Sequence, residues 1–139
     1  MDNRDEVIVA VAAVMTDAQG RILLSLRSEP PKRGYWHHPG GTPEFGESLH
    51  QALRRELREE IGIETEVTSA QPVFVSQTII PREGRHIICL FYEARILSGQ
   101  PKPGQGTAMV GYFGETEARD LRLLDSCRDF LNKRHGWRL

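Results

Sequence analysis

The sequence predicts an α+β fold in which a mixed β-sheet is flanked by helices, and three observations carry this prediction. Short apolar or alternating segments bounded by Gly, Pro and Asp residues recur along the chain, as is typical of strands joined by turns. Residues 47–61 and 117–133 have the spacing of helices. The length of 139 residues suits one domain, which we expect to span residues 1–139.

The first predicted strand, residues 7–15, is a continuous apolar run (VIVAVAAVM) of the kind found in buried strands. Acidic residues precede it and no small-residue cleavage site follows, which favours a core strand over a signal peptide. A turn at residues 17–20 leads to a second strand at residues 21–27, so we expect these two strands to form a hairpin. After a loop with two prolines, residues 35–38 form a short extended piece that ends at a Pro-Gly-Gly turn.

The remaining strands follow the first helix, and we expect them at residues 63–68, 73–80, 85–95 and 109–113. The short connection PREG at residues 81–84 makes the second and third of these a hairpin. The last helix, residues 117–133, has four apolar residues on one side, namely Leu121, Leu124, Cys127 and Leu131.

Charge and composition limit the classes of partner. The formal net charge is −1, which gives no general attraction to nucleic acid or to an acidic membrane. No stretch is long and apolar enough to span a bilayer. Cys89 and Cys127 sit in apolar patterns, where buried free thiols are expected, and this fits a reducing cytoplasm. We therefore expect a cytoplasmic protein without nucleic-acid or membrane partners, and leave a homodimer open.

Residues 41–63 are the most informative part of the chain. Glu56, Glu59 and Glu60 have helical spacing and share one helix face. Neighbouring carboxylates repel one another, whereas a divalent cation such as Mg²⁺, held by carboxylates and substrate phosphates, would make the cluster favourable. Most Glu- and Arg-rich helices are simply solvated surfaces, so the three acids alone do not establish a metal site.

The acids belong to a longer pattern, G-x5-E-x7-R-E-U-x-E-E-x-G-U, in which U is apolar. Every position of the pattern is met, by Gly41, Glu47, Arg55, Glu56, Leu57, Glu59, Glu60, Gly62 and Ile63. This stretch closely resembles the Nudix box, the motif of the Nudix hydrolase family. The resemblance implies the αβα sandwich of Nudix domains, with a mixed β-sheet flanked by helices.

The resemblance also implies roles for the residues of the box. Glu56, Glu59 and Glu60 match the family's ligands for Mg²⁺ or Mn²⁺. Glu56 and Glu59 are our candidates for the catalytic carboxylate, with Glu56 preferred as the base. Glu47 and Arg55 are implied to be structural, and their spacing lets the Arg55 guanidinium reach the Glu47 carboxylate.

Four residues outside the acidic cluster are also candidates for the site. Arg27 ends a predicted strand, where family members often have a phosphate-binding arginine; a solvated strand-end arginine is the alternative. Gly40 and Gly41 allow a sharp turn beside the site, and we expect them to contact substrate. His38 stands where the family usually has an apolar residue, and a buried, hydrogen-bonded histidine is favoured there over a ligand contact.

One departure from the family pattern concerns the loop before the last strand. Many family members carry another acid there, but residues 98–113 contain none. Glu93 and Glu115 are the nearest candidates to replace it.

The function implied by the resemblance is Mg²⁺-dependent hydrolysis of a nucleoside diphosphate linked to another group. The short chain favours nucleoside triphosphates or nucleotide sugars as the small-molecule substrate. An ADP-ribose pyrophosphatase and a non-catalytic nucleotide sensor of the same fold are the alternatives, although the intact box disfavours the sensor. A prenyl diphosphate isomerase of the same fold would need a catalytic cysteine beside the site. Cys89 and Cys127 lie in strand and helix patterns far from the box in the sequence, which disfavours this reading.

Overall fold

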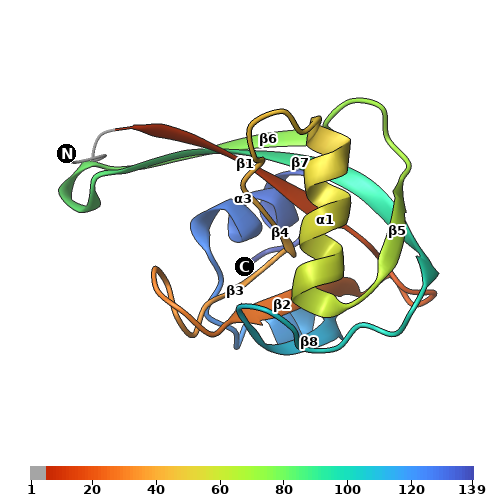
Figure 1. Ribbon diagram of the computed structural model, residues 1–139. Coiled ribbons are helices and arrows are strands. Elements are labelled where there is room, and N and C mark those ends of the chain that lie inside the picture. The colour runs from red at the N-terminus through yellow and green to blue at the C-terminus, as the bar shows by residue number, and fades with distance from the viewer. Residues whose placement is uncertain (1–5) are drawn as a thin grey trace.

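The computed structural model describes residues 6–139, in which two β-sheets lie between helices (Figure 1). The larger sheet has five strands in the order β4-β1-β7-β5, with β6 also paired to β7. Its strands are β1 (Val7–Val14), β4 (Gly40–Gly41), β5 (Glu64–Val67), β6 (Phe74–Ile80) and β7 (Arg85–Ser98). The sheet is mixed, because β1 runs parallel to β7 whereas the other pairs are antiparallel.

The smaller sheet has three strands in the order β3-β2-β8. These are β2 (Ile22–Arg27), β3 (Trp36–His37) and β8 (Thr107–Phe113). Helix α1 (Leu49–Ile61) covers one side of the sheets and α3 (Asp125–Lys133) covers the other. A 3₁₀ turn, η1 (Pro81–Glu83), and a short helix, α2 (Glu115–Ala118), lie in connections. The predicted fold class, helices flanking a mixed sheet, is confirmed.

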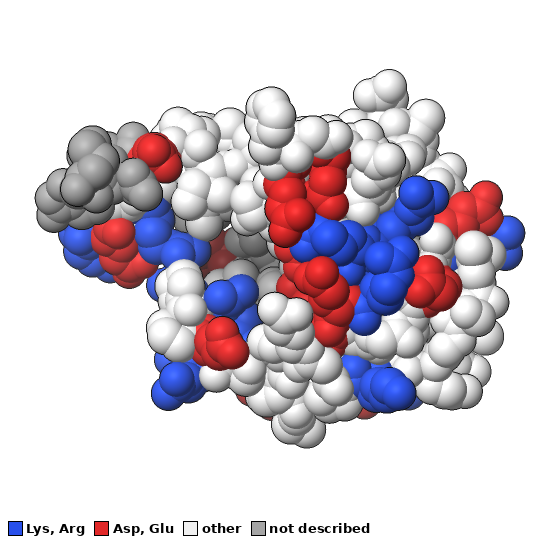
Figure 2. Space-filling model, in the orientation of Figure 1, with Lys and Arg blue, Asp and Glu red and all other residues white. Residues whose placement is uncertain are grey.

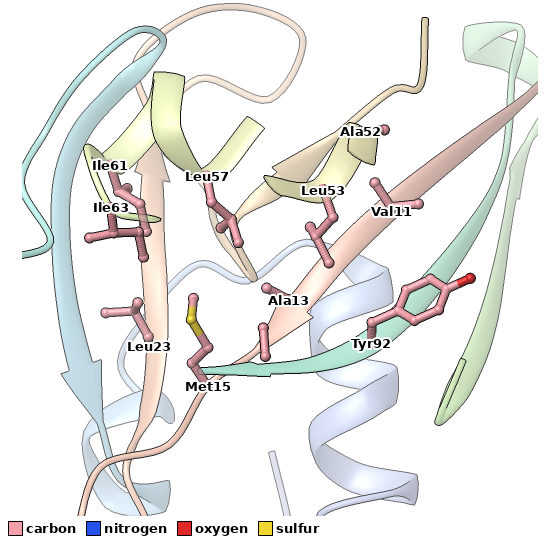
Figure 3. Close-up of a cluster of buried hydrophobic side chains, with 11 residues drawn as sticks. Val11, Ala13, Met15, Leu23, Ala52, Leu53, Leu57, Ile61, Ile63 and Tyr92 are labelled. Atoms are coloured by element: carbon pink, nitrogen blue, oxygen red, sulfur yellow. The ribbon is translucent and has the colours of Figure 1, made fainter. Parts of the chain in front are cut away.

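Side-chain alternation along β1 divides the core into two halves. Val11 and Ala13 join the cluster that packs under α1 with Leu53 and Leu57 (Figure 3). Ala12 belongs to the second cluster, on the α3 side. A strand covered on both faces needs apolar residues at successive positions, which explains the apolar residues from Val11 to Val14. The prediction of a buried strand fails for its first residues, because Val7, Ile8 and Val9 are exposed.

The expected hairpin between the first two strands does not form. The chain turns back after β1, and the Leu23 N–H donates to the Met15 carbonyl over 2.9 Å. Beyond an isolated bridge between Thr16 and Ile22, the two strands enter different sheets. Along its whole length β1 pairs with β7, and β2 pairs with β3 and β8, so the pairing was decided by strands distant in the sequence.

Helix α1 begins at Leu49, two residues later than the start predicted at Glu47. Ser48 is the N-cap: its Oγ accepts from the Gln51 N–H over 3.1 Å, and the Gln51 side chain accepts from the Ser48 N–H over 2.8 Å. This reciprocal capping box fixes the first turn. At the other end Gly62 adopts the left-handed conformation, φ 71°, as its place after the helix predicts.

The single helix predicted at residues 117–133 is wrong. The structure has two helices, α2 and α3, separated by an extended segment. The Trp36 N–H donates to the Arg122 carbonyl over 2.7 Å, and the Leu124 N–H donates to the Trp36 carbonyl over 3.0 Å. The segment therefore leaves the helical path because its backbone bonds to β3, and Leu123 is buried instead of facing outward.

The second predicted hairpin is confirmed. Strands β6 and β7 are antiparallel from the Phe74–Phe91 pair to the Ile80–Arg85 pair. Gly84 makes the turn with φ 64°, a left-handed conformation that favours glycine. β7 then continues to Ser98, past its predicted end, because its second half pairs with β5.

Both cysteines are free and buried, as the sequence predicted. Burial raises the pKa of Cys89 to about 12, so its thiol stays protonated near neutral pH. Among residues 6–139 there is no helix with the length and apolar character needed to cross a membrane.

Candidate active site

The three acids of α1 do not all meet at one point. The Glu56 and Glu60 carboxyl groups lie within hydrogen-bonding reach of each other. Glu59 lies further out, 40% exposed, with its Oε1 3.2 Å from an Arg55 guanidinium nitrogen. Figure 2 shows acidic and basic side chains gathered over α1, beside a hollow in the surface.

The Gly40–Gly41 pair allows these carboxyl groups to approach β4. The Gly40 N–H donates to Glu60 Oε1 over 3.3 Å. A Cβ at Gly41 would fall within the Glu56 carboxyl group, and a Cβ at Gly40 would collide with the Val11 carbonyl of β1. Only glycine leaves room for the backbone beside β1 at position 40, whereas a side chain at position 41 would displace the Glu56 carboxyl group.

Burial raises the pKa of both Glu56 and Glu60; repulsion from Glu59 adds to the shift of Glu56, and repulsion from Glu56 adds to the shift of Glu60. Two half-buried carboxyl groups in contact favour a proton or a cation between them, and oxygen ligands of this kind suit Mg²⁺ or Mn²⁺. Within residues 6–139, no three Asp, Glu, His or Cys side chains are close enough to form a metal site by themselves. The pair therefore fits a hard cation whose coordination is completed by other oxygens, such as substrate phosphates.

Arg55 connects α1 to the loop before it. Its guanidinium donates to both Glu47 oxygens, over 2.6 and 3.0 Å, and to the Thr42 carbonyl over 3.1 Å. The predicted contact between Arg55 and Glu47 is therefore present, with two hydrogen bonds from the guanidinium group to the carboxylate. Bonding to the guanidinium lowers the pKa of Glu47. The same guanidinium lies 3.4 Å from Glu56 Oε2, so it also sets the position of that carboxylate.

A cavity of about 360 Å³ opens beside Gly40 and Gly41. Its walls come from β1, β6 and β7 on one side and from β2, β3 and the loop after β2 on the other. The side chains of Ile8, Ala10 and Ile87 make an apolar wall. Glu56, Glu59 and Glu60 are not part of the lining, but Gly40 and Gly41, which touch two of them, are.

Positive charge enters the cavity from two strands. Arg27, at the end of β2, lines it, with its Nε bonded to the Pro31 carbonyl over 2.7 Å. Burial lowers the pKa of Arg27, which still interacts electrostatically with Glu60 and Arg85. Arg85 also lines the cavity, and its Nε has no hydrogen-bond partner among the described residues. Both guanidinium groups thus bring positive charge to the cavity, and Arg85 Nε also lies 3.7 Å from Glu83 Oε1.

Two arginines, Arg82 and Arg85, flank the tip of the β6–β7 hairpin, and the structure gives them different surroundings. Arg82 is exposed, whereas Arg85 is half-buried in the cavity. The signal lies in the two-residue period of β7, because Arg85, Ile87 and Cys89 all line the cavity. Lys32, which also lines the cavity, lies 3.6 Å from Glu83, a contact that joins the loop after β2 to the turn η1 between β6 and β7.

The two histidines before the Pro-Gly-Gly turn both line the cavity. His38 is buried, as expected, but it is not hydrogen-bonded: neither ring nitrogen has a partner within residues 6–139. His37 is half-buried. Loss of solvation within the protein, and secondly the positive charge of Arg27, lower the pKa of His37 to about 3. Both imidazoles are therefore neutral near neutral pH.

The loop before β8, which contains no acid, forms hydrogen bonds with the C-terminal end of α1. The N–H groups of Lys102, Gly104 and Gln105 donate to the last carbonyls of α1, over 3.0, 2.7 and 2.9 Å. The loop thereby caps the helix end that carries Glu59 and Glu60. Neither substitute acid lines the cavity: Glu93 borders a separate groove, and Glu115 bonds to Arg119 and to the Arg138 N–H.

Comparisons with known proteins agree with the fold and the motif. The family model of the NUDIX domain matches residues 7–131. An ADP-ribose pyrophosphatase of Methanocaldococcus jannaschii is 31% identical over 105 residues, which cover 76% of this chain and 60% of that protein. A CTP pyrophosphohydrolase of Escherichia coli is 44% identical over 61 residues, which cover 43% of this chain and 45% of that protein. The alignments thus span less than two thirds of either relative.

A solved structure is similar over almost the whole chain. The crystal structure of a MutT NUDIX hydrolase from Burkholderia pseudomallei superposes with a TM-score of 0.80 and 28% identity, over 92% of this chain and 98% of that one. The family model covers most of the chain and includes the complete box. The chain therefore belongs to the Nudix family.

Proposed function

We propose that this protein is a Mg²⁺- or Mn²⁺-dependent pyrophosphohydrolase that cleaves a nucleoside diphosphate linked to another group. One observation carries the proposal: the Glu56 and Glu60 carboxyl groups meet at the Gly40–Gly41 backbone, next to a cavity that Arg27 lines. Family membership supports the same chemistry. Cytoplasmic location is part of the proposal and is supported by the two free thiols.

The charges of the site suit attack on a diphosphate. Its oxygens repel a nucleophile, so positive charge must be placed on them, and Arg27 and Arg85 are in position to supply part of it. A divalent cation held by Glu56 and Glu60, with Glu59 turning in from Arg55, would supply the rest.

Glu56 is our candidate for the base. It would take a proton from a water molecule while the water oxygen bonds to one phosphorus and the bridging P–O bond breaks. The products are a nucleoside monophosphate and the phosphorylated second group. In this proposal Glu47 and Arg55 hold the loop in place, and Gly40 and Gly41 contact substrate through their backbone.

Nucleoside triphosphates and nucleotide sugars are the proposed substrates. The name of the E. coli relative, a CTP pyrophosphohydrolase, supports the first class. ADP-ribose is the second candidate, supported by the name of the M. jannaschii relative. The complete box disfavours a non-catalytic sensor.

The proposal is tested by turnover on a panel of nucleoside triphosphates, nucleotide sugars and ADP-ribose, with Mg²⁺, Mn²⁺ or EDTA, reading the phosphate products. We expect wild-type hydrolysis only with metal. Glu56→Gln and Glu60→Gln should each slow it by about 100-fold or more, the usual scale for losing a catalytic carboxylate.

Glu66→Gln is the matched control, because Glu66 is an exposed β5 acid paired with Arg95 and lies outside the cavity. It should keep wild-type turnover. Near-normal turnover in both α1 variants, or no hydrolysis of any compound with either metal, would contradict the proposal.

A further inference from the structure

Glu83 shares one carboxylate oxygen between two basic side chains of the cavity. Its Oε1 lies 3.6 Å from Lys32 Nζ and 3.7 Å from Arg85 Nε. Lys32 and Arg85 line the cavity, whereas Glu83 does not. The carboxylate therefore neutralises, from outside the lining, two positive charges that belong to the cavity.

The contact joins two segments that are distant in the sequence and accessible to water. Lys32 belongs to the loop after β2, residues 28–35, and Glu83 belongs to the turn η1; both segments lie at the left of Figure 1. The side chains of Lys32, Glu83 and Arg85 are 25%, 36% and 21% exposed. A dissolved ligand can reach such a contact, and ion pairs in contact with water are weak enough to exchange partners.

The backbone of Lys32 is strained. Within residues 6–139, Lys32 is the one residue other than glycine with a positive φ, 66°. A residue with a side chain adopts this left-handed conformation at a cost in free energy that glycine avoids. Strain of this kind is concentrated at ligand-binding segments, so it points to a task for the lysine side chain.

Three contacts hold Lys32 in this conformation. One is the ion pair with Glu83. The second is the position of Nζ over the Tyr35 ring, 5.4 Å from its centroid, and the third is the Tyr35 N–H, which donates to the Lys32 carbonyl over 3.1 Å. Because Tyr35 also lines the cavity, the ammonium group is held between the cavity wall and the η1 carboxylate.

Lys32 also lies next to Arg27, the candidate for a phosphate contact. The Arg27 Nε donates to the Pro31 carbonyl over 2.7 Å, on the residue directly before Lys32. Both side chains line the same cavity, and Arg27 interacts electrostatically with Glu60. A lysine ammonium is a point charge on a flexible stem, so it can exchange a carboxylate for a phosphate by rotating its side chain.

We propose that Lys32 binds a phosphate group of the substrate, and that Glu83 holds this lysine in an autoinhibitory contact until a phosphate takes its place. The inference rests on the proposed function, because it takes a diphosphate as the ligand of the cavity. It adds a residue of the loop after β2 to the site, and it gives the turn η1 control over ligand entry.

The first test is the binding of inorganic pyrophosphate, measured by calorimetry in EDTA at low ionic strength. Glu83→Gln removes the competing charge and should tighten binding about fivefold, the scale of a partly exposed ion pair. Lys32→Met removes the ligand contact and should weaken binding by a similar factor. Lys32→Arg keeps the charge and should bind within about twofold of wild type.

A double variant tests whether Glu83 acts through Lys32. In the Lys32→Met background, Glu83→Gln should tighten binding by less than about twofold, because the contact that it releases is already absent.

Hydrogen exchange of the protein without ligand reports the contact between the loop and η1. The Gly34 and Tyr35 N–H groups donate to the Arg27 and Lys32 carbonyls, over 2.9 and 3.1 Å. Glu83→Gln and Lys32→Met should both speed exchange at these two amides, because each removes the tie to η1. The two variants thus change exchange in the same direction and affinity in opposite directions, which a merely structural role of the loop does not produce.

Glu66→Gln and Lys133→Met are the matched controls. Each removes the exposed charge of an ion pair outside the cavity lining, with Arg95 and with Asp129 respectively. Both variants should bind pyrophosphate as wild type does.

Four results would overturn the inference: no binding of pyrophosphate to wild type, unchanged or weaker binding in Glu83→Gln, an equal gain from Glu83→Gln with and without Lys32, or unchanged exchange in both variants. None of these measurements involves turnover, so failure of the hydrolase proposal is separable. A protein that shows the expected binding pattern but hydrolyses no compound with either metal would refute the hydrolase proposal alone.

Discussion

At the scale of single residues, Arg55 shows how the site is held. Its guanidinium contacts the Glu47 carboxylate and the Thr42 carbonyl on one side and the acids of α1 on the other. It does not line the cavity. Its contacts therefore point to the positioning of the loop and of Glu56, and not to substrate charge.

We expect Arg55→Ala to lower kcat on the order of 100-fold with little change in KM, because a displaced carboxylate and loop misalign the reacting groups. Its melting temperature should also fall. Arg55→Lys keeps the charge without the two-pronged fork and should recover little activity. Steady-state kinetics and thermal melts measure both effects; a large rise in KM with kcat and melting temperature unchanged would show a substrate contact instead.

At the scale of elements, the end of α1 depends on the loop before β8. Gly104 lies so close to the helix end that a Cβ there would be 2.6 Å from the Glu59 carbonyl and 2.9 Å from the Glu60 carbonyl. The same residue donates its N–H to the Glu60 carbonyl. The loop before β8 contains no acid itself, but its contacts with α1 help to fix the positions of Glu59 and Glu60.

We expect Gly104→Ala to destabilise the protein by about 1–3 kcal/mol, the usual cost of forcing extra volume into a packed place. Turnover should fall as well, because the helix end shifts. Gly114→Ala is the control, since its Cβ would meet nothing nearer than 3.4 Å. Urea unfolding distinguishes them, and equal stability of the two variants would mean that the loop adapts without moving the helix.

At the scale of the whole molecule, keeping a buried histidine neutral makes stability depend on pH. The pKa of His38 is about 3 in the folded protein against an ordinary value of 6.5. The unfolded chain therefore binds more protons between these values, so this stability is present above pH 6.5 and is lost as pH falls towards about 3.

We expect wild type to lose about 2 kcal/mol more than His38→Leu when the pH falls from about 7.5 to about 5, measured by urea unfolding. Asp17, Glu47 and Asp129 have lowered pKa values, so their contributions are lost only in stronger acid. Equal losses in the two proteins would show that His38 is protonated in the fold, or that the fold opens around it.

The sequence by itself determined the fold class, the first helix and the motif. The box of residues 41–63 has fixed spacing, and its contacts between Glu47 and Arg55 and between Glu56 and Glu60 lie within or next to one helix. Local periodicity is enough to predict such neighbours. The β6–β7 hairpin could be predicted for the same reason, because a tight turn fixes the pairing of the strands on either side.

Only the tertiary structure decided the contacts between distant segments. It paired β1 with β7 instead of β2, and it drew residues 121–124 out of the helix to bond with Trp36. It brought Arg27, Arg85 and His38 to one cavity and separated Glu59 from the other two acids. Local sequence patterns cannot predict these contacts. Each contact depends on the free energy of burying side chains and pairing backbone groups that lie far apart in the sequence.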